Sequence, residues 1–246
     1  MGKTILITGA SSGIGRALAG ELAGRGYSLG LVARRLEVLE VIRDEILSKY
    51  PSLSVAIGRL DVTDYPSVPA CIDEMADALS GLDIVMANAG IGRGESIGRN
   101  QFENAKITIE TNLLGAIATL DAAVAYFLKR GVGHIVATSS VAAFRGLPHS
   151  SSYCASKAGL ATYLEALRAE VYAKNIDITI LYPGFIDTPL NDMVPSRPFL
   201  ISARKAASII ARLIEKKAKS SMVPWWPWCI ARGLLKILPV RIIAKL

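Results

Sequence analysis

Six short apolar runs, separated by longer amphipathic stretches, most strongly constrain what this chain can fold into. We predict a β-strand in each of the runs KTILITG, YSLGLVAR, LSVAIGRLDV, DIVMANAG, HIVATSS and DITILYPG. Their apolar residues are nearly continuous rather than alternating, which is typical of strands covered on both faces. A seventh short strand is predicted at SSMVPW, after an amphipathic helix over SARKAASIIARLIEKKA.

The helical stretches between the strands imply right-handed crossovers within one parallel sheet. We therefore predict an α/β fold, a Rossmann-like doubly wound parallel sheet of about seven strands with helices on both faces. Alternation alone leaves flavodoxin-like and hydrolase folds open. The chain of 246 residues has no repeat or polar linker that would separate two cores. We assign residues 1–224 to the main domain and residues 225–246 to a basic, Trp-rich, amphipathic C-terminal extension of it.

Charge is distributed unevenly along the chain. The net charge is +7, and no acidic residue follows Glu215. The basic residues after that point are Lys216, Lys217, Lys219, Arg232, Lys236, Arg241 and Lys245. A uniformly basic protein would suggest nucleic acid, whereas a neutral body with a basic, tryptophan-bearing end indicates contact with an anionic surface. We therefore expect no nucleic-acid partner.

The three cysteines are widely separated and form no CxxC pair, so we expect neither a disulfide framework nor a metal site.

The first residues, MGKTILITGA, lead directly into a strand and lack the features of a secretory signal. We expect a cytoplasmic protein. We interpret His134 as a residue at the start of a strand and His149 as a surface residue of a loop.

The first predicted strand ends in TGASSGIG, a glycine-rich turn that leads into a helix. At such a turn, backbone N–H groups and the positive end of the helix can hold a pyrophosphate. The GxxxGxG spacing differs from the common GxGxxG fingerprint, no GK[ST] follows, and a plain glycine-rich turn is the alternative. The predicted cofactor contacts here are Gly9, Ser11, Ser12, Gly13, Ile14 and Gly15.

The second predicted strand ends in VARR, where dinucleotide folds that prefer NAD place an acidic residue for the ribose 2′-hydroxyl. Arg34 and Arg35 stand there instead, and guanidinium groups suit a 2′-phosphate. We therefore predict NADP(H) in preference to NAD(H). The alternative is that both arginines are solvated residues at the start of a helix.

The segment SSSYCASKAGL places Tyr153 and Lys157 four positions apart at the start of a predicted helix. Residues at this spacing project from the same helix face, so the phenol and the ammonium lie side by side. By itself the pair favours ordinary packing, in which the lysine extends along the ring toward solvent, and the rest of the chain must decide.

Together these features resemble the short-chain dehydrogenase/reductase superfamily in its single-domain form of about 250 residues. The resemblance runs from Lys3 to about Pro189. Its markers are TGASSGIG, LDVT with Asp61, ANAG at 87–90, TNLLG with Asn112, TSS ending in Ser140, YCASK, and YPGFIDT at 182–188. One departure is Ala87, where the family often has a second Asn before Asn88, and we expect no effect on catalysis.

The resemblance implies catalytic roles for four residues. Tyr153 would be the general acid of carbonyl reduction, with Lys157 favouring its phenolate and holding the nicotinamide ribose. Ser140, 13 residues before Tyr153, would hydrogen-bond the substrate carbonyl. Asn112, in a long helix that we predict to begin near Gln101, would hold a water that joins Lys157 to solvent.

The resemblance also implies further cofactor contacts. These are Asp61 and Val62 at the adenine, Asn88, Ala89 and Gly90 at the adenosine ribose, and Pro183, Gly184, Ile186 and Thr188 at the nicotinamide, beside Tyr153 and Lys157.

We therefore expect an NADP(H)-dependent oxidoreductase that interconverts a carbonyl and an alcohol by hydride transfer, in the reductive direction, as a homo-oligomer (dimer or tetramer). The alternative is a catalytically silent NADP(H)-binding interaction protein, against which the complete catalytic set argues. A sugar epimerase of the extended family is disfavoured, because no separate substrate domain follows the sheet.

The extension VPWWPWCIARGLLKILPVRIIAKL combines tryptophans, aliphatic residues and regularly spaced basic residues, as interfacial segments do. It is too short and too interrupted, with Pro239 inside it, to span a bilayer. We expect residues 225–246 to bind an anionic membrane surface, peripherally and at its inner face, which favours a lipid-like substrate. The alternative is a helix packed over the pocket or against a partner subunit.

Overall fold

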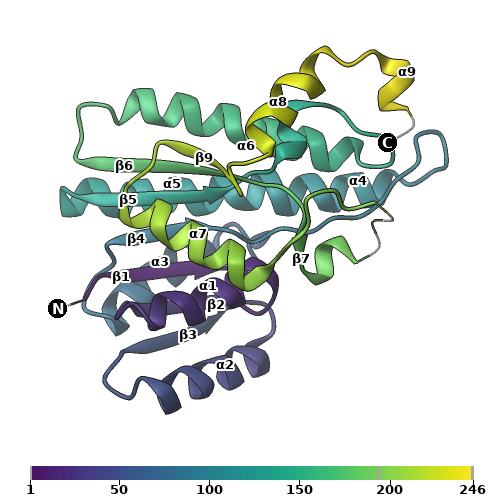
Figure 1. Cartoon of the computed structure of the whole chain (residues 1–246). Coiled ribbons are helices and arrows are strands. Elements are labelled where there is room, and N and C mark those ends of the chain that lie inside the picture. The colour runs from purple at the N-terminus through teal and green to yellow at the C-terminus, as the bar shows by residue number, and fades with distance from the viewer. Residues whose placement is uncertain (1, 193, 195, 245–246) are drawn as a thin grey trace.

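The computed structural model describes residues 2–192, 194 and 196–244. Its centre is a parallel sheet of seven strands in the order β3-β2-β1-β4-β5-β6-β9 (Figure 1). The strands are β1 (Thr4–Thr8), β2 (Ser28–Ala33), β3 (Val55–Arg59), β4 (Ile84–Ala87), β5 (Gly133–Thr138), β6 (Ile176–Pro183) and β9 (Ser220–Val223). The predicted fold class is confirmed, and each predicted strand overlaps one of these seven; β5 and β6 begin one residue earlier than predicted.

Helices cover both faces of the sheet (Figure 1). One face carries α1 (Gly13–Ala23), α2 (Leu36–Lys49) and α7 (Ala203–Glu215), and the other carries α3 (Ser67–Ala78), α5 (Gly115–Arg130) and α6 (Ser151–Glu170). In β1 the side chains of Ile5 and Ile7 lie in the core beneath α1, α2 and α7, whereas that of Leu6 lies in the core beneath α3, α5 and α6. Because successive side chains of a strand point to opposite faces, both must be apolar here.

Asn112 lies in a helix with an irregular turn. The helix α4 (Phe102–Ile109) continues through a π-helical turn, η1 (Glu110–Leu114), into α5. By length and composition this 29-residue helix could cross a membrane. It is instead a core helix, because Leu120, Ala123 and Phe127 are fully buried in the core that lies on the sheet. The helix itself was predicted, but the π-turn, a feature often found at functional sites, was not.

The segment between β6 and α7 contains short elements that the sequence did not predict. These are the parallel pair β7 (Ile186–Asp187) and β8 (Ile201–Ser202), and a 3₁₀ turn, η3 (Pro189–Asn191). Within this segment Arg197 Nη1 lies 3.7 Å from an oxygen of Asp187 and 3.9 Å from one of Asp192. These ion pairs connect Arg197 to two other positions of the same segment.

The C-terminal extension forms α8 (Trp228–Ile237) and α9 (Val240–Ile243), which project from the upper right of the molecule in Figure 1. The sequence treats its three tryptophans as one interfacial cluster, and this is wrong for Trp228. Trp225 and Trp226 are 61% and 64% exposed, whereas Trp228 is 5% exposed. Its ring centroid lies 6.0 Å from that of Phe185 and 5.7 Å from that of Phe199, so this tryptophan packs in the core.

His134, at the start of β5 as predicted, makes the fold sensitive to acid. Its side chain is buried, and Nε2 lies 2.8 Å from Thr179 Oγ1 on β6. Burial lowers the pKa of His134 from 6.5 to about 4, against a smaller raising effect of Asp177. The unfolded chain therefore binds this proton near pH 6.5 and the folded chain only near pH 4. Stability from the neutral histidine is complete above pH 6.5 and decreases as the pH falls toward 4.

We predict that His134→Gln removes part of this acid sensitivity. Between pH 7 and pH 4.5 the wild type should lose about 2.5 kcal/mol more of its free energy of unfolding than the variant does. Urea denaturation at the two pH values measures the difference. His149→Gln is the control, because His149 is exposed. Equal pH dependence in the wild type and His134→Gln would contradict the prediction.

Candidate active site

A cavity of about 820 Å³ runs along the carboxyl ends of the strands, from the turn after β1 to α8. The strands are parallel, so these ends lie at one edge of the sheet. The chain leaves β1 toward β2 on one side, whereas β4 pairs with β1 on the other side. Such a reversal of strand order leaves a crevice in which α/β proteins bind ligands.

The glycine-rich turn lies where predicted, between the end of β1 and the start of α1. Gly9 has φ of +69°, and a Cβ there would come within 2.7 Å of Ala89 Cα. Only a glycine therefore allows the turn to pack this closely against Ala89. Gly13 and Ile14, at the start of α1, line this end of the cavity, and the first backbone N–H groups of a helix have no partner within it. This cradle fits the pyrophosphate of a dinucleotide.

The two arginines after β2 have different surroundings, although the sequence treats them alike. Arg35 Nη2 donates to Ser11 Oγ at 3.0 Å, which ties this guanidinium to the glycine-rich turn. Arg34 is two-thirds exposed, and its Nη1 lies 3.8 Å from Asp61 Oδ2. Asp61 also accepts from the backbone N–H and hydroxyl of Thr63 through Oδ1, at 3.0 and 2.8 Å. Both guanidiniums line the cavity next to the turn.

Asn88 joins the ends of three strands. Its Nδ2 donates to Thr8 O at 3.0 Å, and its Oδ1 accepts from Thr138 Oγ1 at 3.2 Å. Thr8 Oγ1 in turn accepts from the backbone N–H groups of Asn88 and Ala89, at 3.0 and 3.1 Å. Because its amide is used in this way, Asn88 shapes the floor of the cavity by holding β1, β4 and β5 together.

Tyr153, Lys157 and Ser140 all line the same cavity. Tyr153 and Lys157 lie in the first two turns of α6, with the lysine Nζ 5.8 Å from the centroid of the tyrosine ring. Lys157 Nζ donates to Thr138 O at 2.9 Å. Ser140 follows β5, and its Oγ accepts from Ala142 N at 3.1 Å, which fixes the hydroxyl at the start of the 3₁₀ turn η2 (Val141–Phe144).

Burial shifts the pKa values of both titratable residues toward their neutral forms. It lowers the pKa of Lys157 from 10.5 to about 8. It also raises the pKa of Tyr153 above its ordinary value of 10.0, and a hydrogen bond with Ser140 opposes this effect. The strongest influence on the Tyr153 pKa in this structure is thus desolvation. The predicted favouring of the phenolate by Lys157 stays a prediction.

Asn112 lies behind the cavity wall. The side chain is fully buried in the π-turn; its Nδ2 donates to Ile91 O and its Oδ1 accepts from Ile91 N, both at 2.8 Å. Its amide therefore holds the segment after β4. A Cβ on Gly90 would lie 3.2 Å from Asn112 Oδ1 and 3.4 Å from Lys157 Nζ, so Gly90 separates the two side chains. The water-holding role implied for Asn112 stays a prediction.

Most of the other predicted cofactor contacts line the cavity, and their roles stay predictions. The cavity wall includes Gly9, Ser11, Ser12, Gly13, Ile14, Val62, Ala89, Gly90, Pro183, Gly184, Ile186 and Thr188. Gly15 is not part of this wall: a Cβ there would approach Gly9 O to 2.5 Å, so this glycine allows α1 to pack closely against the turn. Among the described residues, no three His, Cys, Asp or Glu side chains form a group that could hold a metal ion.

Glu95 is a site residue that the sequence analysis missed. Its carboxylate is buried and accepts from both the backbone N–H and the hydroxyl of Ser152, each at 2.5 Å. It therefore caps α6 one residue before Tyr153, where Ser150, the N-cap residue, makes no side-chain cap bond. A carboxylate suits the positive end of a helix. No sequence signal links positions 57 residues apart.

The inner face of α8 corresponds to the alternative stated for the extension, a helix packed over the pocket, although the sequence analysis named no residues for it. Trp228, Ala231, Leu235 and Leu238 line the cavity. Gly184 makes this close approach feasible, because a Cβ there would collide with the Trp228 indole. The spacing of three and four positions between the four residues is a helical signal that could have identified this face.

Comparisons with known proteins agree with this architecture. The family model described as short chain dehydrogenase matches residues 3–198. An uncharacterized oxidoreductase of Mycobacterium tuberculosis is 38% identical over 241 residues, covering 98% of this chain and 95% of that protein. An NADP-dependent 3-hydroxy acid dehydrogenase of Schizosaccharomyces pombe is 37% identical over 189 residues, covering 76% of this chain and 73% of that protein.

Solved structures share the fold. The X-ray structure of an alcohol dehydrogenase from the archaeon Thermococcus sibiricus, complexed with 5-hydroxy-NADP, has a TM-score of 0.81 and 28% identity. The similarity covers 92% of this chain and 98% of that one. The cavity places Ser140, Tyr153 and Lys157 beside the glycine-rich turn. Because the family model also matches most of the chain, this protein belongs to the short-chain dehydrogenase/reductase family of oxidoreductases.

Proposed function

We propose that this protein uses NADP(H) to interconvert a carbonyl group and an alcohol, in the reductive direction. The observation that carries the proposal is that Ser140, Tyr153 and Lys157 line the same cavity as the glycine-rich turn. A hydroxyl, a phenol and an ammonium next to a dinucleotide cradle match the needs of hydride transfer to a carbonyl. A binding protein without activity has no need of this set.

Bound NADPH would supply the hydride for this reaction. Tyr153 then donates a proton to the carbonyl oxygen as negative charge develops there, and the Ser140 hydroxyl donates a hydrogen bond to the same oxygen. Lys157 is a cation at pH 7, because its pKa is about 8. Its positive charge favours loss of the Tyr153 proton, and its remaining N–H donors are suited to the ribose hydroxyls. Glu95 positions Tyr153 through the start of α6.

The preference for NADP(H) rests on Arg34 and Arg35. Both guanidiniums lie beside the glycine-rich turn, and no carboxylate stands at the end of β2, where NAD-preferring folds place one. The name of the Schizosaccharomyces pombe relative and the ligand of the Thermococcus sibiricus structure are compatible with this preference. We further propose a cytoplasmic homo-oligomer, a dimer or tetramer, that lies at the inner face of a membrane and acts on a lipid-like substrate.

The first test is Tyr153→Phe. We predict a loss of turnover of about 10³-fold, because the ring stays and only the proton donor is removed. A screen of carbonyl substrates, followed by the absorbance of NADPH, measures the rate, and NADPH fluorescence measures binding, which should persist. Tyr172→Phe is the matched control, because Tyr172 is 88% exposed. Retention of wild-type turnover by Tyr153→Phe would refute the mechanism.

A second test concerns the choice of cofactor. Replacing both Arg34 and Arg35 by Ala should weaken NADPH binding by about 10- to 100-fold, since charged hydrogen bonds to the 2′-phosphate are lost. NADH binding should change little. The ratio of the two dissociation constants is the readout, and Arg43→Ala on α2, which pairs with Asp44, is the control. A parallel loss for both cofactors would rule out the assignment.

A third test uses pH. Lys157 is charged below its pKa of about 8 and neutral above it. For reduction, kcat/KM should be flat below that pH and should then decrease about tenfold per pH unit as the cation is lost. In Lys157→Arg the decrease at this pH should be absent, because arginine stays charged. A profile of the wild type that stays flat up to pH 10 would contradict the role of the Lys157 charge.

A further inference from the structure

The helix α8 carries three stripes of different chemistry. Its inner stripe, Trp228, Ala231, Leu235 and Leu238, lines the cavity. An outer stripe of Ile230, Leu234 and Ile237 is exposed by 60%, 51% and 78%. Between them lie the exposed basic residues Arg232 and Lys236, four positions apart. One helix thus presents an apolar wall to the site and an apolar, base-flanked face to the outside.

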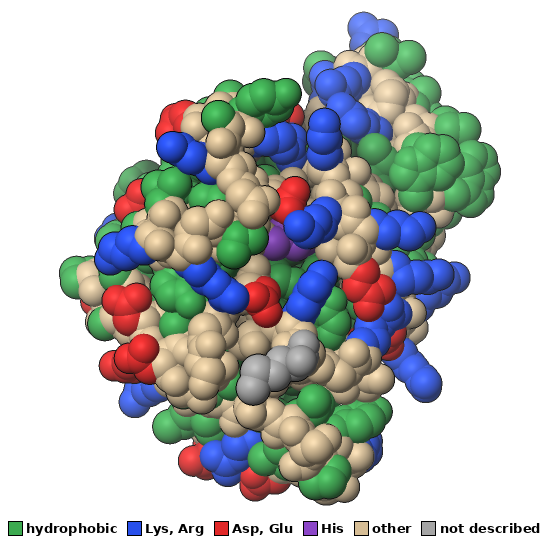
Figure 2. Space-filling model, turned by 90° about the vertical axis from the view of Figure 1, so that its left-hand side faces the viewer, with side chains coloured by type: hydrophobic (Ala, Val, Ile, Leu, Met, Phe, Trp, Pro, Cys, Tyr) green, Lys and Arg blue, Asp and Glu red, His purple; other side chains and the backbone are tan. Residues whose placement is uncertain are grey.

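The outer stripe continues on both sides of α8. Trp225 and Trp226 precede it with 61% and 64% exposure, and Val240 follows it with 72%. We define the apolar ridge as Trp225, Trp226, Ile230, Leu234, Ile237 and Val240. Figure 2 shows hydrophobic side chains together with Lys and Arg on the upper part that projects from the body, at the height of α8 and α9 in Figure 1. A contiguous exposed patch of this kind marks an interaction surface.

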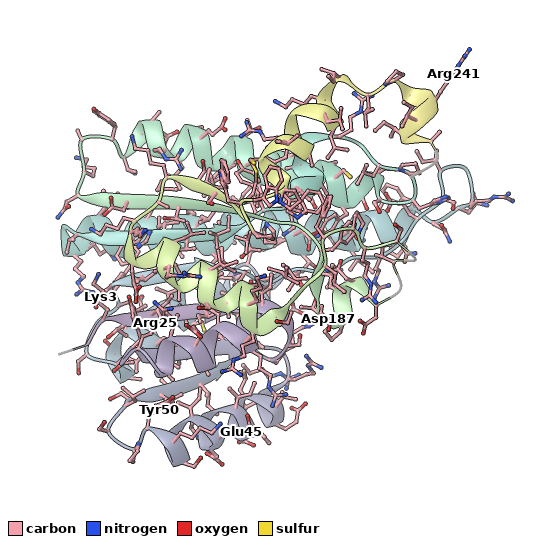
Figure 3. All side chains as sticks on the ribbon, viewed as in Figure 1. Lys3, Arg25, Glu45, Tyr50, Asp187 and Arg241 are labelled. Carbon is pink, nitrogen blue, oxygen red and sulfur yellow. The ribbon has the colours of Figure 1, made fainter. Side chains whose placement is uncertain are left out.

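Charge identifies what covers the ridge. No acidic residue follows Glu215, and Arg241 projects away from the body (Figure 3). A second copy of this chain docked symmetrically would bring the same basic residues together, and like charges would repel. An anionic lipid surface instead pairs them with opposite charge, while tryptophans lie at the level of the headgroups.

The ridge also borders the entrance of the active site. Leu234 lines the cavity and is half exposed, so the rim of the cavity and the ridge share a residue. Inside the rim the wall stays apolar through Leu235 and Trp228 to Phe185. These apolar side chains of the rim and of the inner wall are suited to contact an acyl chain that enters the cavity from a lipid surface.

The catalytic segment holds α8 in place. Arg145, which follows the turn η2, donates from Nη2 to Leu238 O at 3.2 Å, at the end of α8. The Arg232 guanidinium lies 4.5 Å from the centroid of the Phe144 ring, within η2. The turn η2 begins directly after Ser140. The packing of α8 against η2 therefore also orients the end of the cavity at which Ser140 lies.

We propose that the apolar ridge docks on an anionic lipid surface, and that the enzyme takes from this surface a carbonyl substrate with a long acyl chain. The docking stands on the ridge and its charges alone. The substrate class rests on the proposed function.

Docking is tested with vesicles of phosphatidylcholine and phosphatidylglycerol against vesicles of phosphatidylcholine alone. The intact protein should co-sediment with the anionic vesicles, and salt should weaken the binding. Lys236→Glu with Arg241→Glu should lower the affinity by about thirtyfold or more. The matched control is Lys49→Glu with Lys129→Glu, an equal charge change at two exposed positions away from α8.

Tryptophan fluorescence gives a readout that does not depend on activity. The chain has three tryptophans. Anionic vesicles should shift the emission of the wild type to the blue, because Trp225 and Trp226 enter an apolar surrounding. Trp225→Phe with Trp226→Phe retains only the buried Trp228 and should show no shift. Unchanged emission of the wild type together with no co-sedimentation overturns the docking. The docking is also overturned if the protein dimerises and Lys236→Glu with Arg241→Glu strengthens this dimerisation.

The substrate class is tested separately, with ketones that share one reacting group and differ in chain length. kcat/KM should increase with chain length, and Ala231→Phe, which narrows the inner wall, should lower it about tenfold for long chains and little for short ones. Equal values for all lengths overturn the substrate class. If no carbonyl is reduced but vesicles still bind, the proposed function and the substrate class fail and the docking stands.

Discussion

Burial of the sheet on both faces is the constraint on which the rest of this structure depends. The strands are connected through segments whose helices cover both faces, and such crossover connections keep the strands parallel. Every strand then ends at the same edge. The polar groups that cannot enter the cores, from the glycine-rich turn to Ser140, gather at that edge and form one cavity.

The same burial sets the chemistry of the site. Lys157 and Tyr153 lie in a poorly solvated part of the cavity, where the neutral form of each is favoured. Both the charged and the neutral form of Lys157 are accessible near neutral pH, since its pKa is about 8. Neighbouring groups hold this part of the site in place: Thr138 accepts from the lysine, Glu95 caps the helix that carries both residues, and Asn112 fixes the segment after β4.

The extension after β9 connects this site to the outside. α8 lies against the turn that follows Ser140, so its inner stripe completes the cavity while its outer stripe remains exposed. One face of this helix therefore covers the pocket, and the other is the face for which we propose binding to a lipid surface. In that proposal, the helix couples the surface to which the protein binds with the substrate that it admits.

The strands, the turn after β1, the long helix with Asn112 and the alignment of Tyr153 with Lys157 could be predicted, because these depend on local periodicity and on glycine spacing. Three features became visible only in the folded chain: Arg35 binds Ser11 while Arg34 faces Asp61, Glu95 caps α6, and Trp228 is buried while Trp225 is exposed. Each of these depends on which distant segments meet at the edge of the sheet. A pattern along the chain records which residues share a face, but the partner of that face is set by packing.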